Sequence, residues 1–88
     1  MMSYQVIIPK PVQKQLDDLP DDVFKRVIEK LDILKENPRP HGCIKLRGFK
    51  NEYRIRIGDY RIRYEVIDKE KIVLLLHCKH RREIYKKN

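Results

Sequence analysis

The order of hydrophobic and polar positions divides the chain into a helical first half and a strand-forming second half. Apolar residues between residues 23 and 34 recur at helical spacing, and charged residues cover the other side of that stretch. Residues 10–18 show the same spacing over a shorter length, and Pro20 is typical of a new helix start. The pattern predicts a helical hairpin over residues 10–37, preceded by a short strand at residues 4–8.

After residue 43 the spacing changes from helical to alternating. Residues 53–57 and 60–66 alternate, and Gly58-Asp59 between them fits a two-residue hairpin turn. Residues 72–76 form a continuous apolar run, as expected of a central strand covered on both faces. We therefore expect an α+β fold, in which an N-terminal helical hairpin packs on an antiparallel sheet of three to four strands. The whole chain, residues 1–88, is expected to form a single domain.

The predicted hairpin places four arginines on one face of the sheet. With Gly58-Asp59 as the turn, Arg56 lies opposite Arg61 and Arg54 lies opposite Arg63. Because like charges directly opposite each other destabilise a sheet, this arrangement indicates a polyanionic partner. The guanidinium fork matches phosphate geometry. Three cations just upstream extend the patch: Lys45, Arg47 and Lys50.

A second interpretation is that the arginines only shield a solvent-exposed sheet face, with Glu52, Asp59 and Glu65 as partial counter-charges. The distribution of charge favours the interpretation that the arginines bind a polyanionic partner. Residues 1–40 carry seven Lys/Arg and seven Asp/Glu, whereas residues 41–88 carry fourteen against six, which accounts for the net charge of +8. A positive field confined to one half favours a polyanion. Composition alone fits a solubilising surface equally well.

Several other classes of protein fit the sequence poorly. Cys43 and Cys78 are typical of reduced thiols, and with three scattered histidines they form no zinc pattern, so we expect no metal and no cofactor. Residues 1–11 lack an apolar core of signal-peptide length, and residues 72–76 are too few to span a membrane. We therefore expect a cytoplasmic protein without a membrane partner.

The C-terminal segment adds groups that could act in acid–base chemistry. His80 exchanges a proton near neutral pH, Tyr85 carries a phenol, and Arg81 and Arg82 bring fixed charge. Attack of a ribose 2′-hydroxyl on the adjacent phosphate needs a proton acceptor, a proton donor and cations. Taken singly, His80 reads as a surface histidine and Tyr85 as a packing residue, but beside four arginines they predict a site. His77 is expected to be structural, and no partner is visible for His41.

Three blocks of the sequence together resemble the RelE/ParE toxin superfamily. They are Lys45-Leu46-Arg47-Gly48, the hairpin from Tyr53 to Tyr64, and His80-Arg81-Arg82-Glu83-Ile84-Tyr85. The resemblance covers nearly the whole chain and implies the toxin of a type II toxin–antitoxin pair. RelE-like members cut mRNA in the ribosomal A site and are held inactive by an antitoxin that wraps the toxin. The family fold agrees with the fold predicted above.

The resemblance also implies roles for particular residues. Arg54 and Arg56 stand where RelE-type sites have basic residues, often lysine, and Arg61 falls on the family's arginine after the Gly-x-Tyr turn. Arg81, Tyr85 and His80 fall on residues of the C-terminal motif, and Lys79 stands where many relatives have glycine. Arginine is a poor proton acceptor, since its pKa exceeds about 12. The role of general base is therefore expected to move to His80.

The function that follows is metal-independent cleavage of mRNA. Six residues are the catalytic candidates: Arg54, Arg56, Arg61, His80, Arg81 and Tyr85. Six further cations are expected to steer messenger and ribosomal RNA: Lys45, Arg47, Lys50, Arg63, Lys79 and Arg82. The expected partner is a cognate antitoxin, forming a hetero-oligomer with the toxin. The alternatives are a ParE-like toxin that inhibits DNA gyrase without cutting RNA, a non-enzymatic RNA-binding module, and a catalytically dead family member. An RNA-binding module would be expected to carry aromatic residues on the basic face, whereas the sheet tyrosines alternate onto the other face.

Overall fold

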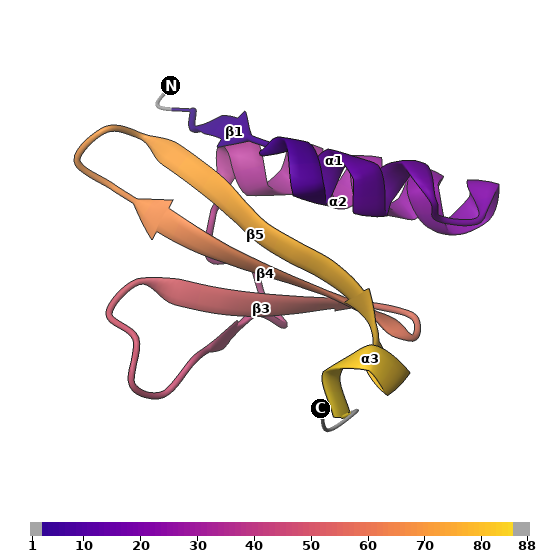
Figure 1. The fold of residues 1–88 in the computed structure, drawn as a ribbon. Helices are drawn as coiled ribbons and strands as arrows, with labels where there is room; N and C mark the ends of the chain where they lie inside the picture. The colour runs from indigo at the N-terminus through magenta and orange to yellow at the C-terminus, as the bar shows by residue number, and fades with distance from the viewer. Residues whose placement is uncertain (1–2, 86–88) are drawn as a thin grey trace.

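The computed structural model describes the backbone of residues 3–85 and the side chains of residues 3–83. Its elements follow the predicted order of a strand, two helices and then strands, and a short helix is added at the end (Figure 1). The bounds are β1 Gln5–Ile7, α1 Lys10–Asp17, α2 Asp21–Glu36, β2 Ile44–Lys45, β3 Glu52–Ile57, β4 Tyr60–Ile67, β5 Ile72–His80 and α3 Arg81–Tyr85. The helical hairpin predicted over residues 10–37 is confirmed as α1 and α2.

The sheet has five strands in the order β1-β5-β4-β3-β2, so the prediction of three to four antiparallel strands was too low. β1 pairs with β5 in parallel, which requires a long connection, and the helical hairpin and the rest of the sheet supply it. β2 is only two residues long, and such a short edge strand carries no periodic signal. Those two additions make the sheet mixed at one edge and wider than expected at the other.

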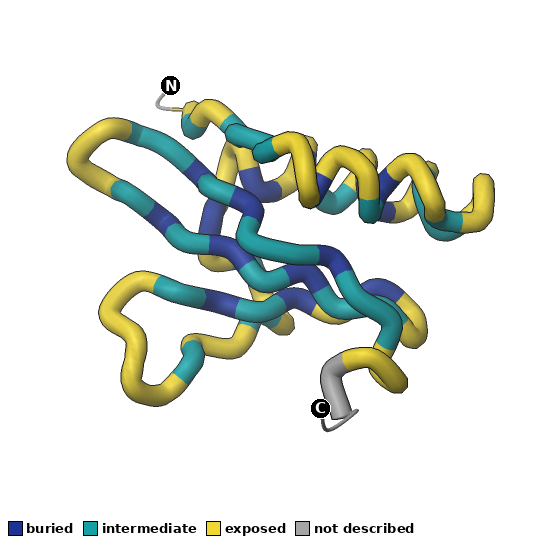
Figure 2. Tube along the Cα trace, viewed as in Figure 1, coloured by how far each residue is buried: buried dark blue, intermediate teal, exposed yellow. Residues whose placement is uncertain are grey.

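Both long helices cover the same face of the sheet and bury their apolar stripes against it (Figure 1). Along β3, β4 and β5, buried positions alternate with partly exposed ones, and the outer sides of α1 and α2 are exposed (Figure 2). The buried residues come from both helices and from the helix-facing side of these strands: Val12, Leu16, Val27, Leu31, Leu34, Tyr53, Ile55, Ile57, Ile62, Tyr64, Val66, Val73, Leu75 and Cys78. The opposite face is therefore left to polar and charged side chains. No helix within residues 3–85 is long and apolar enough to cross a membrane.

The loop after α2 is tied to the sheet by two side chains. The buried Tyr64 hydroxyl donates to the Pro38 carbonyl at 2.8 Å. Arg39 donates to Asp68 through two nitrogens, at 3.1 and 2.7 Å, and its Nε donates to the Tyr53 hydroxyl at 2.8 Å. Hydrogen bonds from Arg39 and Tyr4 lower the pKa of Asp68 to about 2. These contacts hold the chain that enters β2 against the β4–β5 turn.

A bulge in β5 decides which side chains reach the outer face of the sheet. Arg63 pairs with His77, but the next residue, Tyr64, pairs with Leu75, so Leu76 is one residue too many on β5. An extra residue reverses the alternation beyond it. Regular alternation from Leu75 would send His80 to the outer face, whereas the bulge sends His77 there instead.

Candidate nucleic-acid interface

The β3–β4 hairpin has the predicted register. Arg56 pairs with Arg61 and Arg54 pairs with Arg63 across the two strands. Gly58 has a φ of +59°, which the first central residue of this type of tight turn requires and which glycine adopts without strain. The alternation of the sequence and this turn are together enough to fix the register, so the four arginines share the face away from the helices.

The third strand extends this row of cations. Lys79 on β5 pairs with Arg61, and His77 pairs with Arg63. Residues directly opposite each other share a face, so both side chains join the arginines. We call the outer-face set Arg54, Arg56, Arg61, Arg63, His77 and Lys79 the arginine face.

The members of the arginine face are not equally available to a ligand. Arg63 donates its Nε to Glu52 at 2.7 Å and forms an ion pair with the same carboxylate, so much of its charge is met within the protein. Arg56 donates its Nε to the Gly58 carbonyl at 2.9 Å, a neutral partner that leaves its charge in place. Arg54 is partly exposed. Arg54 and Arg56 on β3 therefore offer a stronger positive potential to a ligand than Arg63 on β4 does.

Two side chains lie next to Arg63, and sequence reasoning missed one of them. Phe49, in the β2–β3 loop, lies with its ring 4.4 Å from the Arg63 guanidinium carbon and is 46% exposed. The basic side of the sheet therefore does carry an aromatic ring. It comes from the loop residue Phe49, because the strand tyrosines lie on the other face. Glu52 is the other neighbour, and the counter-charge that the sequence suggested for it is confirmed by its ion pair with Arg63. Arg47 and Lys50 flank Phe49 in the same exposed loop.

His77 is the imidazole on the arginine face, although the sequence suggested only a structural role. Burial, with Lys79 and Arg63 nearby, lowers its pKa, so the ring is neutral at physiological pH. Its Nδ1 is buried without a hydrogen-bond partner among the described residues. The bulge at Leu76 is the reason that sequence alternation did not place it here.

His80 lies elsewhere. It pairs with Tyr60, which itself pairs with Ile57, so its side chain belongs to the helix-facing side at the end of the sheet. The Tyr60 and His80 rings meet edge to face, with centroids 5.1 Å apart. The expectation that His80 joins the arginines on one face is therefore wrong, and the cause is again the bulge that reverses the alternation of β5.

The tail begins beside the hairpin turn. The Arg81 backbone N–H donates to the Asp59 carbonyl at 2.7 Å, and its guanidinium lies 3.9 Å from the Asp59 carboxylate. Arg82 is exposed on the same short helix. The side chain of Tyr85 lies outside the described residues, so its predicted role stays a prediction.

Lys45 is separated from the arginine face. On β2 it pairs with Tyr53, a residue buried on the helix side, whereas Ile44 pairs with Arg54. The prediction that Lys45 extends the basic patch is therefore wrong, because Lys45 lies on the helix side at the edge of the sheet. The two-residue strand could not be seen in the sequence, so neither could the direction of this side chain.

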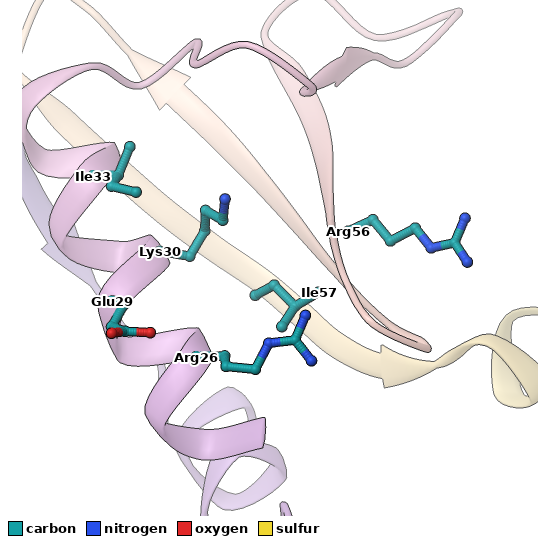
Figure 3. A pocket seen from close by; sticks show the side chains of 6 residues that line it. All are labelled: Arg26, Glu29, Lys30, Ile33, Arg56 and Ile57. Atoms are coloured by element: carbon teal, nitrogen blue, oxygen red, sulfur yellow. The ribbon is translucent and has the colours of Figure 1, made fainter. Parts of the chain in front are cut away.

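A shallow pocket of about 340 Å³ lies on the helix side of β3. The side chains of Arg26, Lys30 and Ile57 point into the space between α2 and β3, whereas Arg56 extends away from α2 (Figure 3). Arg56 belongs to both the lining of the pocket and the arginine face, so the pocket lies at the border between the α2 side of β3 and that face. Over the described part of the chain, no three His, Cys, Asp or Glu side chains gather where they could hold a metal ion.

Comparison with known proteins agrees with this geometry. A family profile described as the ParE toxin of the type II toxin–antitoxin system parDE matches residues 6–85. A Methanocaldococcus jannaschii protein that carries the name RelE1 is 35% identical and is matched over 97% of this chain and 98% of its own length. The RelE chain of the archaeal RelE–RelB complex from Pyrococcus horikoshii superposes with a TM-score of 0.82 at 41% identity, covering 91% of this chain and 97% of that one. The isolated RelE toxin of E. coli superposes with a TM-score of 0.80 at 28% identity, covering 89% and 84%. This chain belongs to the RelE/ParE superfamily of type II toxin–antitoxin toxins.

Proposed function

We propose that this chain is an endoribonuclease toxin that cleaves mRNA on the ribosome and so inhibits translation in the cytoplasm. The observation that carries the proposal is the arginine face, where like-charged side chains stand in register across three strands. Such a face costs stability in the free protein and is compensated when a polyanion binds. RNA supplies closely spaced phosphates, which the guanidinium groups match.

The proposed reaction is a transesterification at phosphorus. The ribose 2′-oxygen forms a bond to the adjacent phosphorus, the bond to the 5′-oxygen breaks, and the products are a 2′,3′-cyclic phosphate and a 5′-hydroxyl. Arg54, Arg56 and Arg61 offset the charge that develops on the phosphoryl oxygens, with Arg81 as a further clamp, so the chain itself supplies the cations that the step needs.

Proton transfer needs a group other than arginine. The sequence suggested His80 and Tyr85 for this role; Tyr85 stays the proposed group, whereas His80 lies on the helix-facing side of the sheet, away from the arginines. The neutral His77 ring is a further candidate acceptor, because it lies on the arginine face beside Arg63.

The proposed partners are RNA and an antitoxin. RelE chains from Pyrococcus horikoshii and from Methanococcus jannaschii were solved in complexes with RelB. By analogy, a cognate antitoxin with an acidic and partly apolar segment binds this chain in a hetero-oligomer. Cations on and around the face steer messenger and ribosomal RNA toward it: Arg47, Lys50, Arg63, Lys79 and Arg82.

The alternative is a ParE-like toxin that inhibits DNA gyrase without cutting RNA. The family profile that matches this chain is named after ParE toxins, and this match supports the alternative. The two functions differ in what stops first after induction: protein synthesis for an mRNA nuclease, DNA replication for a gyrase inhibitor.

Primer extension on a reporter mRNA after brief induction tests the proposal. We expect new 5′ ends within translated codons for the wild type, and none for Arg61→Ala at equal expression and unchanged circular dichroism. Lys14→Ala, an exposed change on α1, is the matched control and should cleave as the wild type does. Intact mRNA during growth arrest, or full cleavage by Arg61→Ala, would overturn the proposal.

A further inference from the structure

The last residue of β5 makes two hydrogen bonds that together begin the tail helix. The His80 Nδ1 accepts from the Arg82 backbone N–H at 3.2 Å. In return, the His80 backbone N–H donates to the Glu83 Oε1 at 3.0 Å. This pattern is a variant of the capping box, because the Glu83 side chain caps the His80 N–H as in that motif, whereas the imidazole accepts from the second helical residue rather than the third. Here an imidazole takes the place that serine or threonine usually occupies.

The cap fixes which nitrogen of the imidazole carries the proton. A neutral ring has one protonated nitrogen and one bare nitrogen. Because Nδ1 accepts the Arg82 N–H, the proton sits on Nε2. In this position Nε2 is a hydrogen-bond donor and has no lone pair with which to take a proton from a 2′-hydroxyl. Protonation at Nδ1 would remove the acceptor on which the cap depends.

The surroundings of the ring agree with a positional role. His80 lies on the helix-facing side with Tyr60, away from the arginine face. The next residue is anchored too, because the Arg81 N–H donates to the Asp59 carbonyl at 2.7 Å. Cap and anchor together hold the start of α3 at the β3–β4 turn.

We infer that His80 is a positioning residue: it caps α3 and so holds Arg81 and the start of α3 at the β3–β4 turn. The inference rests on the proposed function for its effect on cleavage, but the cap itself is a property of the free protein. It separates His80 from the role of general base that the sequence suggested.

A matched pair of substitutions distinguishes the two roles, because the amide of asparagine reaches the place of Nδ1 and the amide of glutamine reaches the place of Nε2. We expect the Arg82 amide of His80→Asn to exchange as slowly as in the wild type. In His80→Gln and His80→Ala it should exchange about fivefold faster, the factor that the loss of a typical cap implies. Single-turnover RNA cleavage should follow the same order, retained by His80→Asn and reduced in the other two.

Two measurements keep the inference separate from the cleavage proposal. Nitrogen-15 spectra of the wild-type imidazole should show a bare Nδ1 and a protonated Nε2, and Glu83→Ala should speed exchange of the His80 amide while Glu83→Gln does not. The reverse tautomer, or equal Arg82 exchange in His80→Asn and His80→Ala, would overturn the cap. Loss of cleavage in His80→Asn with Arg82 protection intact would overturn the positioning role in favour of the base. If the wild type cleaves no RNA, the proposed function fails, and the exchange and tautomer results still decide the cap.

Discussion

At the scale of single residues, the two histidines of β5 lie on faces of the sheet that the sequence did not predict. His77 was expected to be structural and lies on the arginine face, whereas His80 was expected to be the base and accepts a backbone hydrogen bond. One extra residue, Leu76, is responsible, because it reverses the alternation of the strand beyond it. A bulge leaves no trace in a run of apolar residues, so the reversal could not be predicted.

The environment of His77 predicts how stability depends on pH. Its pKa is lowered in the fold by burial and by the nearby Lys79 and Arg63, so the unfolded chain binds a proton more readily than the folded one. As the pH falls through the ordinary histidine pKa of about 6.5, the free energy of unfolding should therefore decrease, and it should level off below the lowered pKa. Urea denaturation across this range measures the slope.

Substitution isolates the contribution of His77 from that of the other histidines. His77→Gln cannot titrate, so its free energy of unfolding should depend less steeply on pH between about 7 and 5 than that of the wild type. Lys14→Gln, an exposed change on α1 that removes no group titrating in this range, is the control and should keep the wild-type slope. An unchanged slope in His77→Gln would show that His77 protonates equally well in both states.

At the scale of elements, the hairpin was predictable and the edges of the sheet were not. Gly58-Asp59 and the alternation on either side of it determine which residues pair, so the arginine register followed from local sequence alone. β2 has two residues and pairs with β3 through Ile44 and Lys45, too few for any period to be recognised. Long-range pairing decides such strands, and a single sequence does not record it.

The arginine pairs on the hairpin predict that a loss of charge stabilises the fold. Arg54 stands directly opposite Arg63, so Arg54→Thr removes one like-charge pair and adds a residue that favours strands. We expect the free energy of unfolding to rise by about 0.2–1 kcal/mol at low salt. Because salt screens exposed charges, the gain should shrink at an ionic strength of about 1 M.

Lys45→Thr is the matched control for this effect. It removes one positive charge from the same sheet, but Lys45 pairs with Tyr53 rather than with a cation. Its free energy of unfolding should change less than that of Arg54→Thr at low salt, as urea denaturation at two salt concentrations would show. An equal rise in the free energy of unfolding of both variants would mean that the net charge of the protein, rather than the facing pair of arginines, causes the destabilisation.

At the scale of the whole molecule, the charge of +8 is concentrated where the fold can present it. Residues 1–40, which form both long helices, carry no net charge, and the excess lies in residues 41–88. The helices cover one face of the sheet, so the outer face is the side on which cations of β3, β4 and β5 gather. The uneven distribution of charge favoured a polyanionic partner, and the topology gathers the cations of three strands on the surface that such a partner would contact.

This concentration of charge predicts how RNA affinity depends on salt. If four cations of the arginine face contact phosphates, the logarithm of the binding constant for a single strand should fall against the logarithm of salt concentration with a slope of about −3. A 2′-deoxy oligonucleotide lacks the attacking hydroxyl, so binding is measured without cleavage. Arg61→Gln should make the slope shallower by about 0.7, whereas Lys14→Gln, on the exposed side of α1, should leave it unchanged. A slope near zero, or equal changes in both variants, would mean that the arginine face does not hold the nucleic acid backbone.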